Sequence, residues 1–368
     1  MTKNQKDWLL AIFLSASLAV IVFIFRQPLL SGFYTLSTKF AQNYVHQDGG
    51  NIVFENIGSG DHLGLYVAVK VDDNCFKKPI NPKSKHTWLF NSGCTVSEYG
   101  FDGFSKNWDL SYQVDEFQMR KVLDQSKKFN EHVLLVGGSY TKGATSPREN
   151  TFIYQFKKFQ ENAGRQGIYN FAIGEGFWSP TNILNYLTDI YPLETIVKNT
   201  DGVMIYNFIY NHFYRVCPDE NIIRDQRGKM LGYTLKDNEL LFNGLLETGS
   251  SSEFVKTYSF DANKKNCMQL FVKVLDELKK LYLLGNTDRK FHMVFLPDQS
   301  HFTESSDFKI FSEILNEHKI NFSIIKLDNS NINNYFWKND SHYRPIGYRE
   351  VGKKLFGIYK SIIRDSSE

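Results

Sequence analysis

The stretch His132-Val-Leu-Leu-Val-Gly-Gly-Ser-Tyr-Thr-Lys-Gly143 decides the fold class of this chain. Its apolar run, 133–136, ends abruptly in Gly137, Gly138 and Ser139. A short apolar run that stops at glycines is typical of a buried strand followed by a tight turn, because glycine adopts backbone conformations that other residues avoid. The stretch therefore predicts a strand that presents the Ser139 hydroxyl at its carboxyl end.

Strand and helix patterns alternate over residues 126–368, which we interpret as one large α/β domain. Short apolar runs predict the strands: 133–136, 167–171, 202–209, 291–296 and 321–327. Amphipathic stripes between them predict the helices: 152–159, 183–191, 267–284, 308–315 and 346–363. This alternation predicts a three-layer α/β/α fold with a mostly parallel central sheet.

Two other regions differ in composition from the α/β pattern. Residues 51–125 contain β-branched runs separated by Asn, Pro and Gly, so we expect a small β-leaning accessory region there. Residues 216–262 are rich in Asp, Asn, Gly and Ser, and they predict an insertion between a strand and a helix.

The N-terminal segment 8–25 predicts a transmembrane helix. It carries no charge over 18 residues, and at about 1.5 Å per residue a helix of this length spans roughly 27 Å, close to the thickness of the hydrocarbon layer. Lys3 and Lys6 favour a cytoplasmic tail at 1–7, a juxtamembrane linker at 26–50 and a main domain in the periplasm or at the cell surface. The alternative is a cleaved signal peptide. It is disfavoured because the small residues at 15–17 lie in the middle of the run.

Charge and cysteine content narrow the class of protein. The 43 Lys and Arg nearly balance 40 Asp and Glu, so no global field recruits nucleic acid. The spacing of the four cysteines contains no C-x-x-C motif, so it does not indicate a zinc site. In an exported domain an even number predicts two disulfides, and the simplest of three pairings joins Cys75 to Cys94 and Cys217 to Cys267. Four buried thiols are the alternative.

A second stretch, Asn339-Asp-Ser-His-Tyr-Arg-Pro-Ile-Gly347, supplies an acid, Asp340, two residues before His342. A serine, a histidine and a carboxylate are the groups that covalent acyl chemistry requires. Two other motifs are excluded at the serine. A phosphate-binding loop needs Gly-Lys-Ser/Thr, whereas the order here is Thr141-Lys142-Gly143, and Thr141 also breaks the G-x-S-x-G elbow.

The motif Gly-Gly-Ser-x-Thr-x-Gly resembles the first block of the SGNH hydrolases, also called the GDSL esterase/lipase family, which reads Gly-Asp-Ser-x-Thr-x-Gly. Three later stretches are similar to the remaining blocks in the same order: 170–176, 202–212 and Asp340-x-His342 with Gly347. The resemblance covers about residues 130–365. It implies a flavodoxin-like arrangement of the parallel sheet. Taken alone, Ser139 is best interpreted as an ordinary small polar residue in a glycine turn. The occurrence of all four blocks in order favours a catalytic site instead.

The resemblance implies a role for each matching residue. Ser139 would be the nucleophile, His342 the general base and Asp340 the acid that orients the imidazole. The oxyanion hole would combine the backbone N–H of Ser139, that of Gly174 or Gly176, and the side-chain amide of Asn211. No metal or organic cofactor is implied.

The chain departs from the family pattern at four places. Gly138 replaces the aspartate beside the nucleophile, and His212 replaces the second acid of the third block. Strict counting from Asn170 puts the oxyanion donor at Glu175. Many members have their acid three residues before the histidine, which is Asn339 here.

We therefore expect a membrane-anchored, extracytoplasmic serine esterase acting on an acylated carbohydrate or a lipid ester. Acetyl groups of an envelope polysaccharide are the expected substrate. An O-acyltransferase would use the same triad, and a catalytically silent SGNH-like binding module is the third alternative. Nucleic acid is not an expected partner, and the sequence indicates no specific protein partner.

Overall fold

The computed structural model describes residues 51–56, 65–71, 92–102, 105–124, 128–176, 178–198, 200–225, 230–246, 252–328, 332–337 and 341–364. The chain divides into two compact units. The first comprises Met1–Val71 and Ser97–Asp109, and the second comprises Asp72–Val96 and Leu110–Glu368. The described residues 110–124 belong to the larger unit.

A four-stranded sheet lies within the region 51–125. Its order is β1 (Asn51–Asn56), β2 (Leu65–Val71), β3 (Thr95–Asp102) and β4 (Ser105–Gln113). β1 and β2 are antiparallel, with Asn51 opposite Val71.

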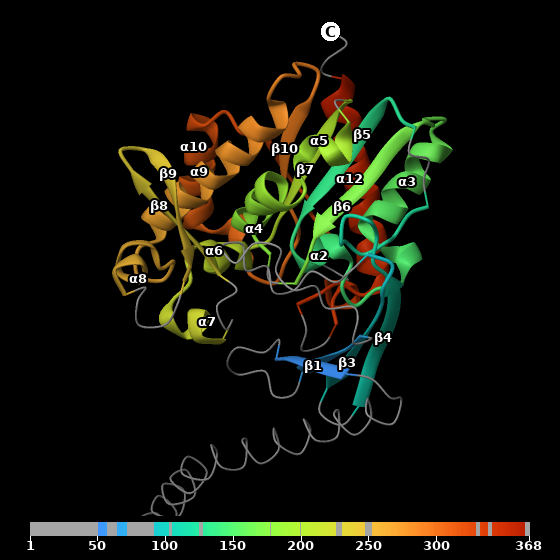
Figure 1. Cartoon of the computed structure of the whole chain (residues 1–368), viewed down its shortest axis with the longest axis horizontal. Coiled ribbons are helices and arrows are strands. Elements are labelled where there is room, and N and C mark those ends of the chain that lie inside the picture. Colours follow the sequence, from blue (N-terminus) through green and yellow to red (C-terminus); the bar gives the residue numbers. More distant parts are fainter. Residues whose placement is uncertain are drawn as a thin grey trace, which may run out of the picture. The chain divides into compact units, whose positions relative to one another are not determined.

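The larger unit is built on a parallel five-stranded sheet with the order β11-β10-β7-β5-β6 (Figure 1). The bounds are β5 (Glu131–Gly137), β6 (Ile168–Gly174), β7 (Asp201–Phe208), β10 (Lys290–Phe295) and β11 (Phe322–Ile324). The predicted strands and the α/β fold class are thereby confirmed, although β11 is shorter than the apolar run that predicted it. In this register Gly137 lies between Asn207 and Gly174.

Helices cover both faces of this sheet. One face packs against α3 (Phe152–Asn162) and α12 (Pro345–Arg364). The other packs against α4 (Pro180–Asn185), α5 (Leu193–Val197), α6 (Asn211–Val216), α9 (Lys264–Leu283) and α10 (Ser306–Glu317). A π-helical turn (Tyr186–Ile190) continues α4. Short helices in the connections are α2 (Ser139–Lys142) and α11 (Ile332–Tyr335), with 3-10 turns at Arg148–Asn150 and Phe302–Glu304.

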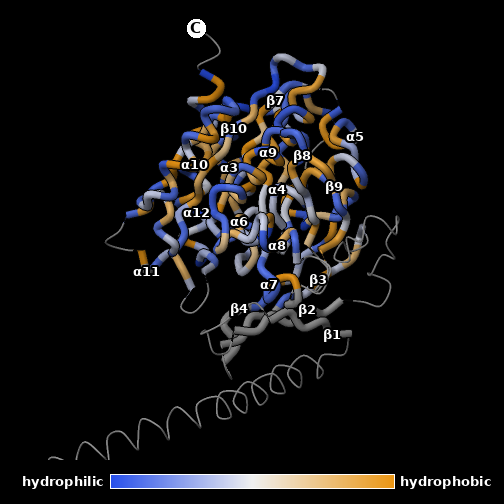
Figure 2. The backbone as a smooth tube through the Cα atoms, turned by 90° about the vertical axis from the view of Figure 1, so that its left-hand side faces the viewer, coloured by the Kyte–Doolittle hydropathy of each residue, from blue (hydrophilic) through white to orange (hydrophobic). Residues whose placement is uncertain are grey.

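The two faces are separated by the alternation of side chains along each strand. In β5, Val133 and Leu135 join the cluster under α3 and α12, while Leu134 and Val136 join the opposite cluster. All four side chains are fully buried. Figure 2 shows the matching alternation of apolar and polar residues along the covering helices. A continuous apolar strand therefore belongs in the middle of the three layers.

The segment 216–262, predicted as an insertion between a strand and a helix, contains regular structure. It carries α7 (Glu220–Asp225), the hairpin β8 (Leu231–Lys236) and β9 (Glu239–Leu245), and α8 (Ser252–Tyr258). The predicted disulfide between Cys217 and Cys267 is confirmed, with its Cα atoms 5.8 Å apart. It ties the residue after α6 to α9. Cys94 is also disulfide-bonded, and Cys75 lies outside the described residues.

Within the part of the chain that the structure describes, no helix combines the length and apolar character needed to cross a membrane. The segment 8–25 lies outside that part. The predicted anchor therefore stays a prediction.

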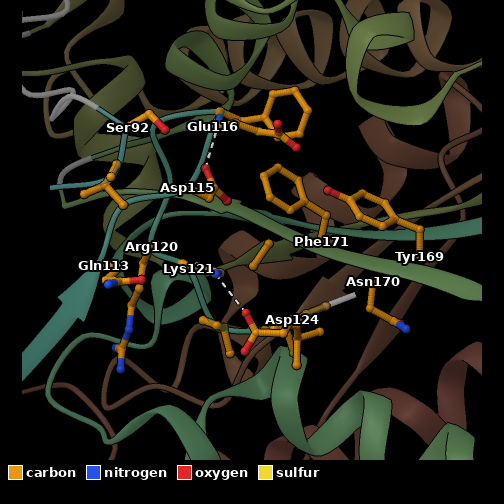
Figure 3. A pocket seen from close by; sticks show the side chains of 17 residues that line it. Ser92, Gln113, Asp115, Glu116, Arg120, Lys121, Asp124, Tyr169, Asn170 and Phe171 are labelled. Carbon is orange, nitrogen blue, oxygen red and sulfur yellow. Dashed lines mark hydrogen bonds and ion pairs between the residues drawn. The ribbon is translucent and has the colours of Figure 1, made fainter. Parts of the chain in front are cut away.

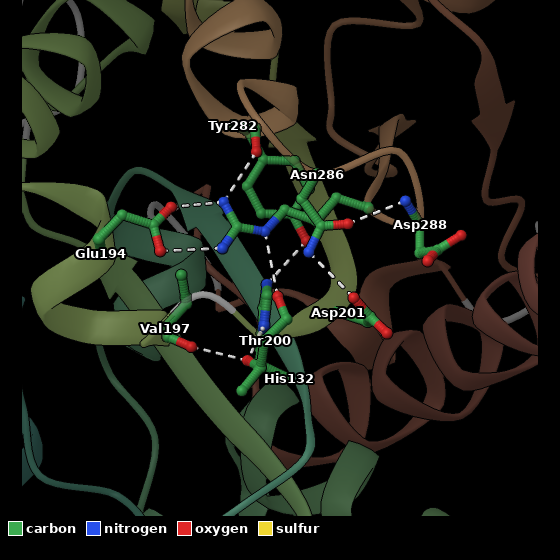
Figure 4. A network of polar contacts seen from close by, with 9 residues as sticks. His132, Glu194, Val197, Thr200, Asp201, Tyr282, Asn286 and Asp288 are labelled. Carbon is green, nitrogen blue, oxygen red and sulfur yellow. Dashed lines mark hydrogen bonds and ion pairs between the residues drawn. The ribbon is translucent and has the colours of Figure 1, made fainter.

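A polar network joins the amino ends of the central strands (Figure 4). The buried guanidinium of Arg289 donates to both carboxylate oxygens of Glu194, at 2.6 and 3.0 Å, and to the carbonyls of Thr200 and Tyr282. The His132 ring lies 2.8 Å from both the Thr200 hydroxyl and the Tyr282 hydroxyl. Burial lowers the pKa of His132 to about 3, so this ring is neutral at physiological pH.

Replacing Arg289 by methionine (Arg289→Met) is expected to lower the free energy of unfolding by about 1–3 kcal/mol, because buried carbonyl acceptors lose their donor. Urea denaturation of the full-length protein measures this. Arg165→Met is the matched control, since the ion pair of Arg165 with Glu131 is solvent-exposed and pairs of that kind contribute about 0–1 kcal/mol. Equal losses in the two variants would contradict the structural role of the network.

Candidate active site

Ser139 lies at the carboxyl end of the sheet, as the first residue of α2 directly after β5. Glycines occupy positions 137 and 138 in this turn, and the surrounding backbone and side-chain atoms leave no room for a Cβ at either position. A Cβ at Gly137 would lie 2.9 Å from the carbonyl oxygen of Asn207, closer than real Cβ atoms approach. Two glycines thus precede the serine at the sheet edge. Replacing either by a larger residue would require neighbouring atoms to move.

His342 lies beside Ser139, although 203 positions separate them in the sequence. Its Nε2 is 2.7 Å from Ser139 Oγ, within hydrogen-bond distance, and the two residues are only 6% and 7% exposed. The two residues on which the predicted chemistry depends are therefore in contact.

Aromatic packing holds the histidine in place. The Tyr140 ring stacks on the His342 ring at 4.9 Å between centroids, and the Tyr140 hydroxyl donates to the carbonyl of Ser341. The neighbouring Tyr343 is buried, and its carbonyl accepts a hydrogen bond from the Thr145 hydroxyl at 3.1 Å. Tyr140 and Thr145, which follow Ser139 in the sequence, thus hold the segment that carries His342.

The predicted acid, Asp340, and its alternative, Asn339, lie outside the described residues. Which of them orients the imidazole stays a prediction.

The loop after β6 contains the candidate oxyanion donors. Gly174 ends β6 opposite Gly137, and a Cβ there would lie 2.7 Å from the carbonyl oxygen of Gly138 and 2.9 Å from that of Gly137. The N–H of Gly176 donates to Oε1 of Glu175 at 2.9 Å, so its hydrogen is already engaged. Of the two glycines considered, Gly174 is therefore the one in contact with the nucleophile turn.

Glu175 also forms a buried ion pair with Lys142 of α2. This pair fastens the loop to the helix that begins with the nucleophile. Counting along the family pattern gave Glu175 only as a candidate backbone N–H donor. The pattern did not indicate that the Glu175 side chain forms an ion pair.

In the third block, the predicted donor Asn211 begins α6 with an exposed side chain. Asn207 in β7 is buried instead, and its Nδ2 donates to the Thr141 hydroxyl of α2 at 3.1 Å. Sequence reasoning missed this residue. An asparagine inside an otherwise apolar strand was the available signal, since a buried amide needs partners.

No group of three or more His, Cys, Asp or Glu side chains that could hold a metal ion occurs among the described residues.

A cavity of about 430 Å³ lies along β6, between residues 113–124 and 169–172 (Figure 3). Asp115 Oδ1 accepts hydrogen bonds from the N–H groups of Phe117 and Met119, both at 2.9 Å. Burial raises the pKa of Asp115 to about 7. Ser139 and His342 do not line this cavity.

Replacing Gly174 by alanine (Gly174→Ala) is expected to lower the free energy of unfolding by about 1–3 kcal/mol, because the added methyl group meets two backbone carbonyls that cannot rotate away. Chemical denaturation measures the change. The control is Gly357→Ala in α12, where nothing lies within 4 Å of the new methyl group and helix propensity favours alanine. A Gly174→Ala variant as stable as wild type would argue against the close backbone packing.

No protein-family model matches the sequence, and the search of curated proteins gives no match. The structure is similar to solved structures of lipases. A lipase from a goat rumen metagenome is 16% identical with a TM-score of 0.35, over 61% of this chain and 95% of that one. A lipase/acylhydrolase from Enterococcus faecalis is 12% identical with a TM-score of 0.35, over 63% and 96%.

A lipolytic protein of the G-D-S-L family from Veillonella parvula is 11% identical with a TM-score of 0.33, over 62% of this chain and 98% of that one. The sequence identities and TM-scores of these three matches are low. The structure itself shows a parallel sheet with Ser139 at the turn after β5 and His342 before α12 in hydrogen-bond contact.

Proposed function

We propose that this chain is an SGNH-type serine esterase that removes O-acyl groups from an acylated carbohydrate or lipid of the cell envelope. The observation that carries the proposal is the 2.7 Å contact between Ser139 Oγ and His342 Nε2 at the carboxyl edge of the sheet. Substrates of parallel α/β folds bind at this edge. Acetyl esters are the proposed leading substrate class.

The contact supports a two-step acyl transfer. Ser139 Oγ attacks the ester carbonyl while His342 Nε2 takes its proton, and the same proton then passes to the leaving alcohol. Water next attacks the acyl-enzyme with His342 again as the base, which releases the acid and restores Ser139. Proton transfer by a positioned base contributes about 10²–10⁴-fold in rate.

Negative charge develops on the carbonyl oxygen in each step. The Ser139 N–H, in the first turn of α2, and an N–H of the loop that begins at Gly174 are the proposed donors. A single such donor contributes on the order of 10²–10³-fold. Asn207 would act indirectly, because its amide holds the Thr141 hydroxyl and with it the orientation of α2.

The proposal includes an N-terminal membrane anchor at 8–25 and a main domain outside the cytoplasm. The uncharged segment supports the anchor. The disulfide between Cys217 and Cys267 supports the compartment, because disulfides persist mainly in oxidising environments.

Wild-type protein is expected to react covalently with a fluorophosphonate, while Ser139→Ala stays unlabelled, because the reagent phosphonylates an activated serine. His342→Ala should lower the labelling rate by about 10³-fold or more, since the serine loses its base. Fluorescence of the labelled band measures this. The variant Ser341→Ala is the control, since alanine keeps the backbone carbonyl that accepts the hydrogen bond from Tyr140. Absence of fluorophosphonate labelling in the wild-type protein would contradict the esterase proposal.

The same assay tests the acid. Asp340→Asn is expected to lower the rate of fluorophosphonate labelling by about 10³–10⁴-fold, because the imidazole of His342 loses the group that fixes its tautomer. Asn339→Ala should leave it nearly unchanged. The reverse result would assign the orienting role to Asn339.

Full-length protein is expected to stay with membranes after an alkaline carbonate wash, and a variant lacking residues 8–25 to be released, because the deletion removes the apolar span. Immunoblotting of pellet and supernatant measures the partition. Protease added outside spheroplasts should degrade the main domain of the anchored protein. A full-length protein found in the supernatant, or protected from the protease, would overturn the anchor or its orientation.

A further inference from the structure

Three groups converge on the backbone of Gly138, the residue before the nucleophile. A Cβ added there would lie 2.7 Å from Arg215 Nη1, 2.9 Å from His212 Nε2 and 3.0 Å from the carbonyl oxygen of Trp178. The first two come from α6 and the third from the loop after β6. Two side chains and one carbonyl therefore pack where any side chain at position 138 would stand.

Arg215 connects these elements by a hydrogen bond. Its Nη1 donates to the carbonyl of Trp178 at 2.9 Å. The N–H of Trp178 in turn donates to the carbonyl of Glu175, at 3.2 Å, which closes the loop after β6. Since the Glu175 carboxylate pairs with Lys142, this loop is fixed to α2 at one point and to α6 at another.

His212 lies beside the guanidinium as a neutral ring. It is 1% exposed, and its Nδ1 is 2.8 Å from the hydroxyl of Tyr206. Nε2, on the side of Gly138, has no hydrogen-bond partner in the described part of the chain. Burial, followed by the charge of Arg215, lowers the pKa of His212 well below its usual range. The ring therefore fills space against the turn without adding a second positive charge.

Arg215 keeps its own charge. Burial lowers its pKa to about 10, which still leaves it a cation at neutral pH. A charge removed from water interacts more strongly with its surroundings than an exposed one. The guanidinium lies against Gly138, the residue before Ser139, because its Nη1 would be 2.7 Å from a Cβ at that position.

We propose that Arg215 is a positioning residue for the reaction. Through Trp178 it holds the loop that begins at Gly174 against the nucleophile turn, and it keeps a fixed positive charge beside that turn. The proposal rests on the proposed esterase function, because the arrangement matters for rate only if Ser139 reacts.

The alternative is that Arg215 merely packs the core. Three substitutions separate the two roles. Arg215→Met keeps much of the apolar side-chain stem but removes the positive charge and the N–H donor. Arg215→Lys keeps a positive charge but lacks the planar guanidinium group. Arg215→Ala leaves a space that a free guanidinium ion can enter.

The experiment compares full-length wild type, the three variants and Ser139→Ala in detergent. It measures kcat and KM for a chromogenic acetyl ester, the rate of fluorophosphonate labelling, and the melting temperature. Arg215→Met is expected to lower kcat by about 10²-fold, the range for loss of an oxyanion-stabilising group, while KM changes little. Arg215→Lys should fall between this variant and wild type. Guanidinium chloride at millimolar, non-denaturing concentration should raise kcat of Arg215→Ala severalfold.

Arg165→Met is the matched control, because Arg165 pairs with Glu131 on the surface and should leave kcat unchanged. A wild-type kcat in Arg215→Met would overturn the inference. So would equal losses in the Met and Lys variants with no rescue by guanidinium, since packing alone explains that pattern. If Arg215→Met does not fold, Arg215→Lys decides: reduced kcat at an unchanged melting temperature supports the inference, and wild-type kcat overturns it. An unlabelled wild type would instead refute the esterase function itself.

Discussion

The close contact among the backbones of Gly137, Gly138 and Gly174 is the constraint on which the site depends. A Cβ at Gly174 would come within 3.0 Å of the carbonyls of both other glycines. Strand pairing brings Gly174 beside Gly137, and the turn at Gly138 then lets α2 begin at Ser139. With side chains at these positions, the loop after β6 and the nucleophile turn would separate, and no pair of backbone donors could face the same oxygen.

Most of the fold could be predicted because its signals are local. Buried parallel strands are continuous apolar runs, and amphipathic stripes mark the helices that cover them. The contact between Ser139 and His342 also followed from topology. The carboxyl ends of parallel strands share one edge of a sheet, and α12 packs beside α3 through Phe156, Phe356 and Tyr359. Packing of this last helix returns the histidine before it to the serine edge.

The side chains that support the pair could not be predicted in the same way. Asn211 matched the family block in the sequence, yet the register of β7 beside β5 places Asn207 next to Gly137 and turns its amide to α2. β5 and β7 lie far apart in the sequence, and the pattern of β7 alone does not say which of its residues lies opposite Gly137. Likewise, no motif in the sequence pairs Lys142 with Glu175. Only the packing of the loop on α2 shows that they form a buried pair.

The two ends of the sheet use buried arginines differently. At the amino end, Arg289 donates two hydrogen bonds to the carboxylate of Glu194, so the opposite charges offset one another. This ion pair stabilises the packing of α5 beside the sheet. At the carboxyl end, Arg215 donates to the carbonyl of Trp178, and this hydrogen bond joins α6 to the loop after β6. Taking a charge out of water is costly in the resting protein. In the proposed reaction that cost would be offset, because a charge already held beside the turn needs no rearrangement when an anion forms.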